Sequence, residues 1–296
     1  MHFQSQIRQF QFLLLIFIIF SFISSTLQTL PVAVFHGIGD ACDFPGTTDF
    51  VDYLKEKLKT EVRCIEQGNG FITSWFSKFS KQAEMACESI RNDPIFQGEF
   101  SVLGISQGTL IARYIIQHCN IKGIVKNFVS IAGPHMGIAA IPRLTCGWLC
   151  DQINGIAAKL FYTDIFQEHL APAGYFKDRH NYESYQQYST FLANLNNEKT
   201  VKNAEYKRRF SLLEKVCLMM NEKDTVISPA STAWFEFYDK EQNKVLPLRE
   251  STFYQEDFIG LRQLDEAGKV KFVKLSGDHI HFSDHDIDTY MLPVLA

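Results

Sequence analysis

Apolar positions along the chain form short runs rich in β-branched and aromatic residues, and stretches with helical periodicity separate them. Runs of the first kind predict strands at residues 32–36, weakly at 64–66, and at 100–105, 127–132, 216–220 and 270–275. Apolar residues at helical spacing predict helices near 50–58, 77–92 and 107–119. Strands that alternate with helices predict an α/β fold, in which helices cover both faces of a mainly parallel sheet.

The alternation stops between about residues 137 and 215, where no strand pattern is found. We expect a mostly helical insertion here, lying over the C-terminal edge of the sheet, where ligands bind in open α/β folds. The alternative is that its apolar stripes only pack on the core. The stripes are formed by Leu149, Ile153, Ile156 and Leu160, and by Tyr185, Phe191, Leu192 and Leu195.

The N-terminus has the pattern of a signal peptide. A short head with Arg8 precedes an apolar run at 10–23, and small polar residues follow from Ser24. A membrane anchor is the alternative, but the run of about 14 apolar residues falls short of the roughly 20 that a bilayer span needs. We therefore predict a signal peptide over residues 1–26, entry into the secretory pathway, and a single domain over 27–296 without a stable membrane span.

Charge and cysteine content limit the ligands to be considered. The 296-residue chain has a formal net charge of −4 and no basic cluster interleaved with aromatic residues, which argues against a nucleic-acid partner. The chain also lacks a CxxC pair and a Cys/His group at zinc spacing, so we expect no metal site.

In an oxidising compartment, the seven cysteines favour disulfides. Cys146 and Cys150 are close enough in sequence to close a short loop. Cys87 and Cys119 lie in the predicted helices on either side of the third strand and are candidates to join them. The odd total leaves at least one thiol unpaired.

One serine stands between two glycines where the third predicted strand gives way to a helix: Gly104-Ile-Ser106-Gln-Gly108. A G-x-S-x-G sequence in a strand–turn–helix context is typical of a nucleophile elbow. Such an elbow holds the serine hydroxyl clear of the sheet and places the N–H of Gln107 beside a developing oxyanion. The alternative is a glycine-rich turn with a surface serine.

A serine hydroxyl needs a base, and the base needs an orienting acid. In α/β-hydrolases the chain order is serine, acid, histidine. The loop after the fifth predicted strand offers Glu222 and Asp224. We prefer Asp224 because Val226 and Ile227 then return the chain to apolar surroundings, which leaves this carboxylate at the buried lip of the loop.

Three histidines follow the last predicted strand, namely His279, His281 and His285. Gly277 and Asp278 suit a turn that presents His279 at the strand edge. If the loop stays extended, His279 and His281 share a face, so spacing alone does not choose between them.

Two further histidines follow strands. We expect His36 to hydrogen-bond within its own loop, which should also supply the N–H of Ile38 as a second oxyanion donor. His135 is placed to line the site, but no catalytic role is expected for it because one base suffices.

The motifs together resemble the lysosomal palmitoyl-protein thioesterases, type 1 more than type 2. The resemblance runs from Pro31 to the end of the chain. It rests on PVAVFHGIGD, GISQG, SIAGPHMG, NEKDTVISP, WFEFY, STFYQEDFIGLRQLDEAGKV and GDHIHFS. It implies an α/β-hydrolase fold in which the insertion at about 137–215 is a helical lid.

The resemblance also implies residue roles. Ser106, Asp224 and His279 fall on the family's catalytic triad, which chooses His279 over His281, and Ile38 and Gln107 match its oxyanion donors. Cys87 with Cys119 and Cys146 with Cys150 match its disulfides, while Cys42, Cys64 and Cys217 remain unassigned. Leu170, Phe176 and Val226 align with positions that line its acyl groove.

The implied activity is hydrolysis of palmitoyl and similar long-chain thioesters on cysteines of proteins or peptides, through an acyl-enzyme and without metal or cofactor. The nearest alternative is a lipase or carboxylesterase acting on oxygen esters, and a more distant one is a lipid carrier without catalysis. The implied location is the lysosome, with secretion as the alternative. Two features depart from the family: Pro134 replaces a polar residue, and the glycosylation triplets of mammalian members are absent.

Overall fold

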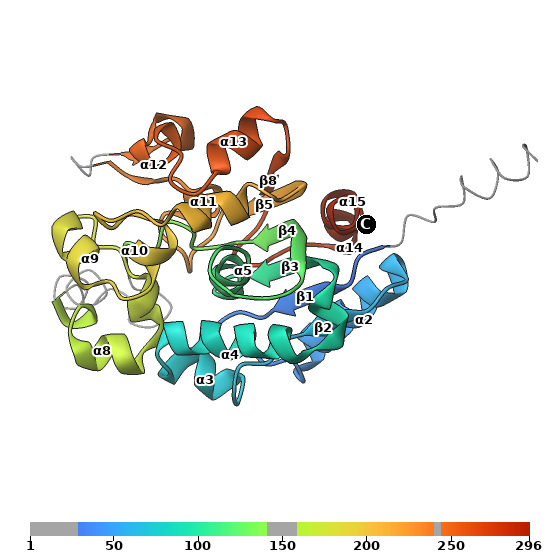
Figure 1. Ribbon diagram of the computed structural model, residues 1–296. Helices are drawn as coiled ribbons and strands as arrows, with labels where there is room; N and C mark the ends of the chain where they lie inside the picture. Colours follow the sequence, from blue (N-terminus) through green and yellow to red (C-terminus); the bar gives the residue numbers. More distant parts are fainter. Residues whose placement is uncertain (1–28, 141–158, 240–243) are drawn as a thin grey trace, which may run out of the picture.

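The computed structural model describes residues 29–140, 159–239 and 244–296 (Figure 1). The predicted signal peptide, the expected pair Cys146–Cys150 and most of the first apolar stripe of the insertion lie outside the described residues.

A six-stranded parallel sheet forms the centre of the molecule, with strand order β2-β1-β3-β4-β5-β8. The chain turns from β1 outward to β2 and then returns to the other side of β1. Loops that leave β1 and β3 therefore meet at a switch point at the C-terminal edge. The strands are β1 (Val32–Phe35), β2 (Val62–Cys64), β3 (Glu99–Ile105), β4 (Ile124–Ile131), β5 (Lys215–Asn221) and β8 (Val270–Leu275).

The inner strands β1, β3, β4 and β5 are mostly buried on both faces of the sheet, which is why they appear as nearly continuous apolar runs in the sequence. In β1, Ala33 and Phe35 face one apolar cluster, whereas Val32 and Val34 face the other. The predicted α/β fold is confirmed. The second strand lies two residues earlier than predicted, because Val62 is the residue that pairs with Val32.

Helices cover both faces as expected (Figure 1). On one face are α4 (Phe79–Asn92) and α5 (Gly108–Gln117), and on the other are α2 (Pro45–Leu58) and α15 (Leu292–Leu295). Helix α2 begins earlier than predicted, with Pro45 in its first turn, where a missing N–H costs nothing. The short helices α3 (Phe71–Phe76), η1 (Pro94–Gln97), α14 (Asp284–Asp286) and η6 (Ile287–Met291) were not predicted.

The described part of the insertion is helical. Its elements are α8 (Asp164–His169), η3 (Ala171–Tyr175), α9 (Tyr182–Tyr188), α10 (Leu192–Leu195) and α11 (Ala204–Phe210). The second apolar stripe is divided between α9 and α10, and all four of its residues are buried in the cluster that contains α4 and α5. These side chains therefore pack on the core. Figure 1 shows α8, α9 and α10 grouped at one end of the sheet, away from α2 and α15.

A smaller unit follows β5. It comprises η4 (Ala230–Trp234), the two-stranded antiparallel pair β6 (Phe237–Tyr238) and β7 (Val245–Leu246), η5 (Leu248–Glu250), α12 (Thr252–Gln255) and α13 (Leu261–Glu266). Two-residue strands give no readable period, so the sequence did not predict them. In the described part of the chain, no helix combines the length and apolar character that crossing a bilayer requires.

Candidate active site

Ser106 lies at the sharp turn between β3 and α5. Its φ is +50°, a left-handed conformation that costs energy in a residue with a side chain. The flanking glycines are sterically required. A Cβ at Gly108 would lie 2.1 Å from the Phe35 carbonyl oxygen, and one at Gly104 would lie 2.4 Å from the Cα of Thr109. The close approach of α5 to β1 and β3 therefore holds the turn in place.

The side chains of Ser106, His279 and Asp224 form one hydrogen-bonded chain. The Nδ1 of His279 lies 2.7 Å from the Oδ2 of Asp224, and its Nε2 lies 2.9 Å from the Oγ of Ser106. A carboxylate only accepts hydrogen bonds, so Nδ1 donates to it and Nε2 is left to accept from the hydroxyl. Within this arrangement the imidazole is oriented to take a proton from Ser106.

The side chain of Asp224 is buried, with 3% of its surface exposed. Its Oδ1 accepts hydrogen bonds from the N–H groups of Val226 and Ile227, at 2.9 and 2.8 Å. The competing Glu222 points elsewhere and accepts from Lys274 on the surface.

Asp278 links the loop after β8, which carries His279, to the loop after β5, which carries Asp224. Its Oδ1 accepts from the N–H groups of His279 and Thr225, at 2.7 and 2.8 Å. Those N–H groups, with Thr225 first, hold the pKa of Asp278 below its usual value. Sequence reasoning assigned this residue only to a turn. The sequence feature that could have identified Asp278 is its position directly before His279, together with the position of Thr225 directly after Asp224.

His281 and His285 are both exposed. The backbone carbonyl of His281 accepts from the side chain of Asn221, whereas the ring of His285 lies near Thr289. Of the three histidines that follow β8, the structure brings only His279 to Ser106.

The two expected oxyanion donors belong to segments that adjoin Ser106. Gln107 follows it directly, and the loop after β1 packs against it: a Cβ on Gly37 would lie 3.3 Å from the Cβ of Ser106. Among the described residues, the backbone N–H groups of Ile38 and Gln107 donate to no protein acceptor. The Gln107 side chain is held on both sides, since it donates to the Ser74 carbonyl at 3.1 Å and accepts from the Tyr175 hydroxyl at 3.0 Å.

The two histidines at strand ends are both buried but differ in their surroundings. His36 lies 2.9 Å from the Gly37 carbonyl oxygen and 2.8 Å from Glu66. His135 lies 2.7 Å from the Ser130 hydroxyl and stacks on Phe235 at 4.3 Å. Complete burial lowers the pKa of His135 well below its usual value. His135 is therefore a neutral core side chain.

The three expected groove residues share one apolar cluster. Phe176 is 1% exposed, while Leu170 and Val226 are half-buried and pack against the cluster. Phe176 packs edge-on against Phe161 at 5.0 Å. This cluster extends from α4 and α5 into the insertion.

Two disulfides are present in the described residues. Cys87–Cys119 joins α4 to the end of α5, and Cys42–Cys64 joins the loop after β1 to β2. Cys217 is free and buried, and burial raises the pKa of its thiol to about 12. Ligand atoms of His36, Cys42 and Glu66 lie within 4.8 Å of one another. Because the sulfur of Cys42 is bonded to Cys64, it is not a thiolate ligand.

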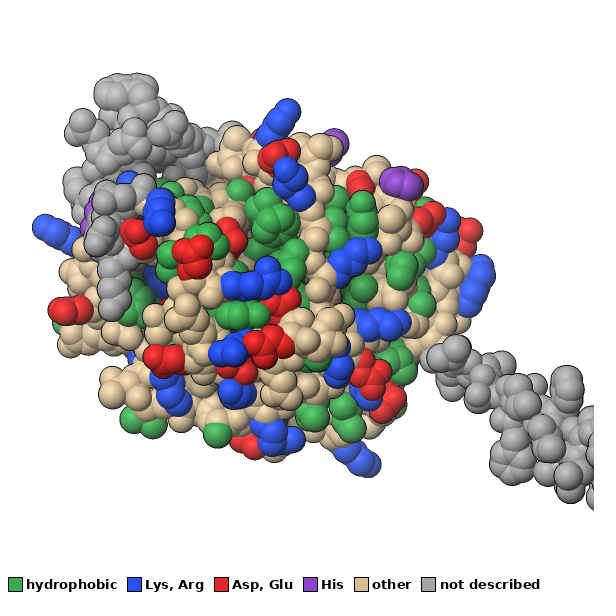
Figure 2. Space-filling model, turned by 90° about the horizontal axis from the view of Figure 1, so that it is seen from above, with side chains coloured by type: hydrophobic (Ala, Val, Ile, Leu, Met, Phe, Trp, Pro, Cys, Tyr) green, Lys and Arg blue, Asp and Glu red, His purple; other side chains and the backbone are tan. Residues whose placement is uncertain are grey.

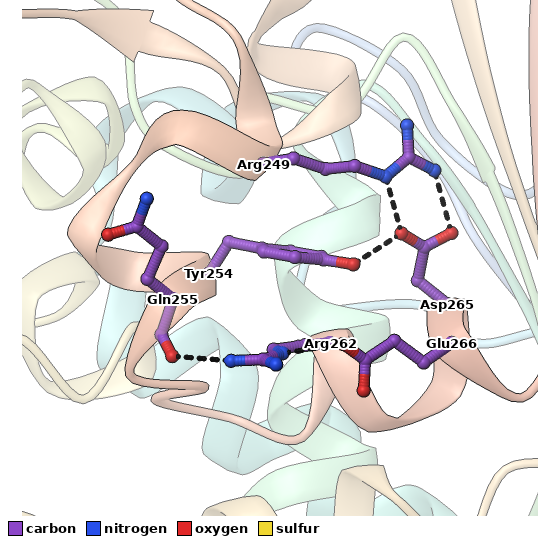
Figure 3. Close-up of a pocket in the computed structure, with 6 residues that line it drawn as sticks. All are labelled: Arg249, Tyr254, Gln255, Arg262, Asp265 and Glu266. Atoms are coloured by element: carbon purple, nitrogen blue, oxygen red, sulfur yellow. Dashed lines mark hydrogen bonds and ion pairs between the residues drawn. The ribbon is translucent and has the colours of Figure 1, made fainter.

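A cavity of about 490 Å³ opens between η5, α12 and α13 (Figure 3). Arg249 forms two hydrogen bonds with Asp265, and Arg262 donates to Glu266. Charged pairs of this kind do not suit an acyl chain. On the face shown in Figure 2, basic and acidic side chains are intermingled and form no region of one sign.

Comparison with known proteins adds to this geometry. The family model described as palmitoyl protein thioesterase matches residues 31–279. Palmitoyl-protein thioesterase 3 of Dictyostelium discoideum is 34% identical over 94% of this chain and 94% of its own length. Palmitoyl-protein thioesterase 1 of Caenorhabditis elegans is 31% identical over 86% and 87%. The lysosomal thioesterase PPT2 homolog of Drosophila melanogaster is 29% identical over 88% of each chain.

The family model and the first two relatives agree over most of the chain. The chain therefore belongs to the palmitoyl-protein thioesterase family and is a thioesterase of the hydrolase class.

Proposed function

We propose that this enzyme removes palmitate and similar long-chain acyl groups from cysteines of S-acylated proteins or peptides. The observation that carries the proposal is the hydrogen-bonded chain from Ser106 through His279 to Asp224, which begins at a strained turn. The thioester specificity rests on the family to which the chain belongs.

In the proposed first step, the Oγ of Ser106 attacks the thioester carbonyl carbon while its proton passes to the Nε2 of His279. Asp224 stabilises the imidazolium that forms. The N–H groups of Ile38 and Gln107 donate to the oxyanion, and each such donor contributes about 10²- to 10³-fold to kcat.

Collapse of the tetrahedral intermediate expels the cysteine sulfur as a thiolate, which takes the proton from the Nε2 of His279, and leaves palmitate esterified to Ser106. A thiol has an ordinary pKa of about 8.5, so its thiolate leaves without strong acid assistance. Water then attacks the ester with His279 again as base, which releases palmitate and restores the Ser106 hydroxyl. This chemistry requires no metal or cofactor.

We assign acyl-chain binding to Leu170, Phe176 and Val226, with the insertion at about 137–215 acting as a lid. Each buried methylene contributes about 0.8 kcal/mol, so eight extra methylenes contribute about 6 kcal/mol before ordering costs. We expect kcat/KM to be much higher for a C16 than for a C8 thioester. Equal kcat/KM values for the two thioesters would contradict the assignment of an acyl-chain groove.

A lipase or carboxylesterase acting on oxygen esters would use the same three side chains. Matched palmitoyl thioester and oxyester substrates separate the two activities, and preference for the oxyester would favour the alternative. A non-catalytic lipid carrier is the other candidate. A serine-reactive phosphonate distinguishes it, because we expect labelling of the wild-type protein and none of Ser106→Ala.

We also propose that residues 1–26 are a signal peptide and that the mature enzyme reaches the lysosome, with secretion as the alternative. Two disulfides in the described residues support an oxidising compartment, and relatives named as lysosomal thioesterases support the destination. N-terminal sequencing of the expressed protein tests cleavage, and a product that begins at Met1 would contradict it. Fractionation of expressing cells and their medium tests the destination.

A further inference from the structure

His36 is buried beside the proposed oxyanion loop, with both ring nitrogens within hydrogen-bond distance of oxygen atoms. Its Nδ1 lies 2.9 Å from the Gly37 carbonyl oxygen, which can only accept, so Nδ1 carries a proton. Its Nε2 lies 2.8 Å from the Oε1 of Glu66. The protonation of His36 therefore depends on that of Glu66.

The surroundings of Glu66 identify it as a carboxylate. Its Oε2 accepts from the N–H of Cys42 at 2.8 Å, and its Oε1 accepts from the N–H of Gln67 at 2.9 Å. Hydrogen bonds from two N–H groups stabilise the charged form of Glu66, and a carboxylate has no proton to donate, so the Nε2 of His36 donates to it. Both ring nitrogens then carry protons, and His36 is an imidazolium within a charge-assisted pair.

The pKa shifts agree with this reading. Burial opposes the charge on His36, but hydrogen bonds to Glu66 and Gly37 outweigh it and raise the pKa above 6.5. Burial likewise opposes the charge on Glu66, but the bonds from His36 and Cys42 outweigh it and lower the pKa below 4.5. The charged groups that face His36 are Glu66 and Asp40, both acids.

The bond to Gly37 determines the direction of a neighbouring N–H. The carbonyl of Gly37 and the N–H of Ile38 belong to one planar trans peptide, so they point to opposite sides. A carbonyl held toward His36 turns the Ile38 N–H away from His36. If His36 loses one proton, the remaining proton favours the side of the Glu66 carboxylate. The bare Nδ1 would then repel the carbonyl at 2.9 Å.

We propose that His36, as an imidazolium held by Glu66, is a positioning residue that orients the Ile38 N–H toward the oxyanion and makes the reaction depend on pH at its alkaline side. This inference rests on the proposed function. The bond to Gly37 is fully present below pH 6.5 and is lost as pH rises through the raised pKa of His36. Because His36 must be protonated to hold the Gly37 carbonyl, the pH profile of the reaction has an alkaline limb.

The test is the pH profile of palmitoyl-cysteine peptide hydrolysis by the wild type, His36→Gln, Glu66→Gln and the control His285→Gln. His285 is exposed on α14, outside the proposed machinery. We expect His36→Gln to lose about 100-fold in kcat with little change in KM, the size of one lost oxyanion donor, and to lose the alkaline limb. Glu66→Gln should move that limb down by about one pH unit, because a neutral partner no longer stabilises the imidazolium. The control should follow the wild type.

A second measurement separates orientation from loss of fold. A palmitoyl trifluoromethyl ketone forms an oxyanion when it adds to Ser106, whereas palmitate does not. Glu66→Gln should therefore lower the affinity for the ketone and leave the affinity for palmitate unchanged. Equal weakening of both ligands would overturn the inference. If the variants do not fold, nitrogen NMR of His36 in the wild type tests the inference directly. Two ring N–H groups at pH 6.5 would support an imidazolium, and one ring N–H group would overturn the inference. An inactive wild type refutes the proposed function, whereas an active wild type with unchanged variants refutes only the role of His36.

Discussion

Replacing Asp224 by asparagine changes which atom faces His279. In the wild type, Oδ1 accepts two backbone N–H groups while Oδ2 accepts from the Nδ1 of His279. In Asp224→Asn, the amide oxygen must keep the Oδ1 position, because an NH₂ group there would face two donors. The NH₂ group is therefore directed at His279.

This substitution forces the wrong tautomer. Nδ1 must now accept from the amide, so the remaining imidazole proton lies on Nε2, where it faces Ser106 and cannot accept the proton of the serine. We expect kcat to fall about 10⁴-fold, as the comparable change does in a serine protease, which corresponds to about 5 kcal/mol in activation free energy. The fold should persist because both N–H bonds to the loop are kept.

The assay is steady-state hydrolysis of a palmitoyl-cysteine peptide, with thermal unfolding as the check on the fold. Glu222→Gln is the matched control: it removes a neighbouring exposed carboxylate whose partner is Lys274, and it should retain wild-type kcat. Loss of less than about tenfold in Asp224→Asn would refute the tautomer argument.

Four further predictions concern the fold that carries the site. Lys177→Met should cost about 3–5 kcal/mol, because it leaves Glu198 charged and buried without its partner at 2.8 Å. Burial opposes the charge on Glu198, but Lys177 and Tyr185 lower its pKa below 4.5. The stability contributed by the ionised Glu198 is therefore complete above pH 4.5 and is lost as pH falls through the lower pKa of the folded state. In urea unfolding, the stability of Glu198→Gln should thus depend less on acid pH than that of the wild type. Replacing Cys42 and Cys64 with alanine should cost about 3 kcal/mol for a separation of 22 residues; unfolding without change in midpoint would contradict this. Gly108→Ala should cost about 3 kcal/mol through overpacking against the Phe35 carbonyl, whereas Gly98→Ala, which meets nothing within 4 Å, should be neutral in a thermal melt.

The inner strands of the central sheet could be predicted because they are mostly buried on both faces and so appear as nearly continuous apolar runs. Shorter elements could not. β6 and β7 have two residues each and α3 has six, which is too few for a period to be read. The second apolar stripe of the insertion appeared as one helix but is divided between α9 and α10, since its residues pack on a common core from two segments.

The candidate site was predictable in its residue types and chain order, since the elbow and the two later loops each have a local pattern. Spacing alone did not distinguish His279 from His281. Contacts between residues that are remote in sequence could not be predicted from local patterns. These are Cys42 with Cys64, His36 with Glu66, and Asp278 with Thr225. These pairs depend on which strand ends lie side by side, which is a property of sheet order.

The most direct test of the account is to trap the acyl-enzyme. Wild-type enzyme is mixed with a palmitoyl-cysteine peptide in a single turnover, quenched with acid and digested for mass spectrometry. We predict a burst of free thiol, palmitate esterified to Ser106, and neither signal in Ser106→Ala. Palmitate on another residue, or thiol release by Ser106→Ala at the wild-type rate, would contradict the account.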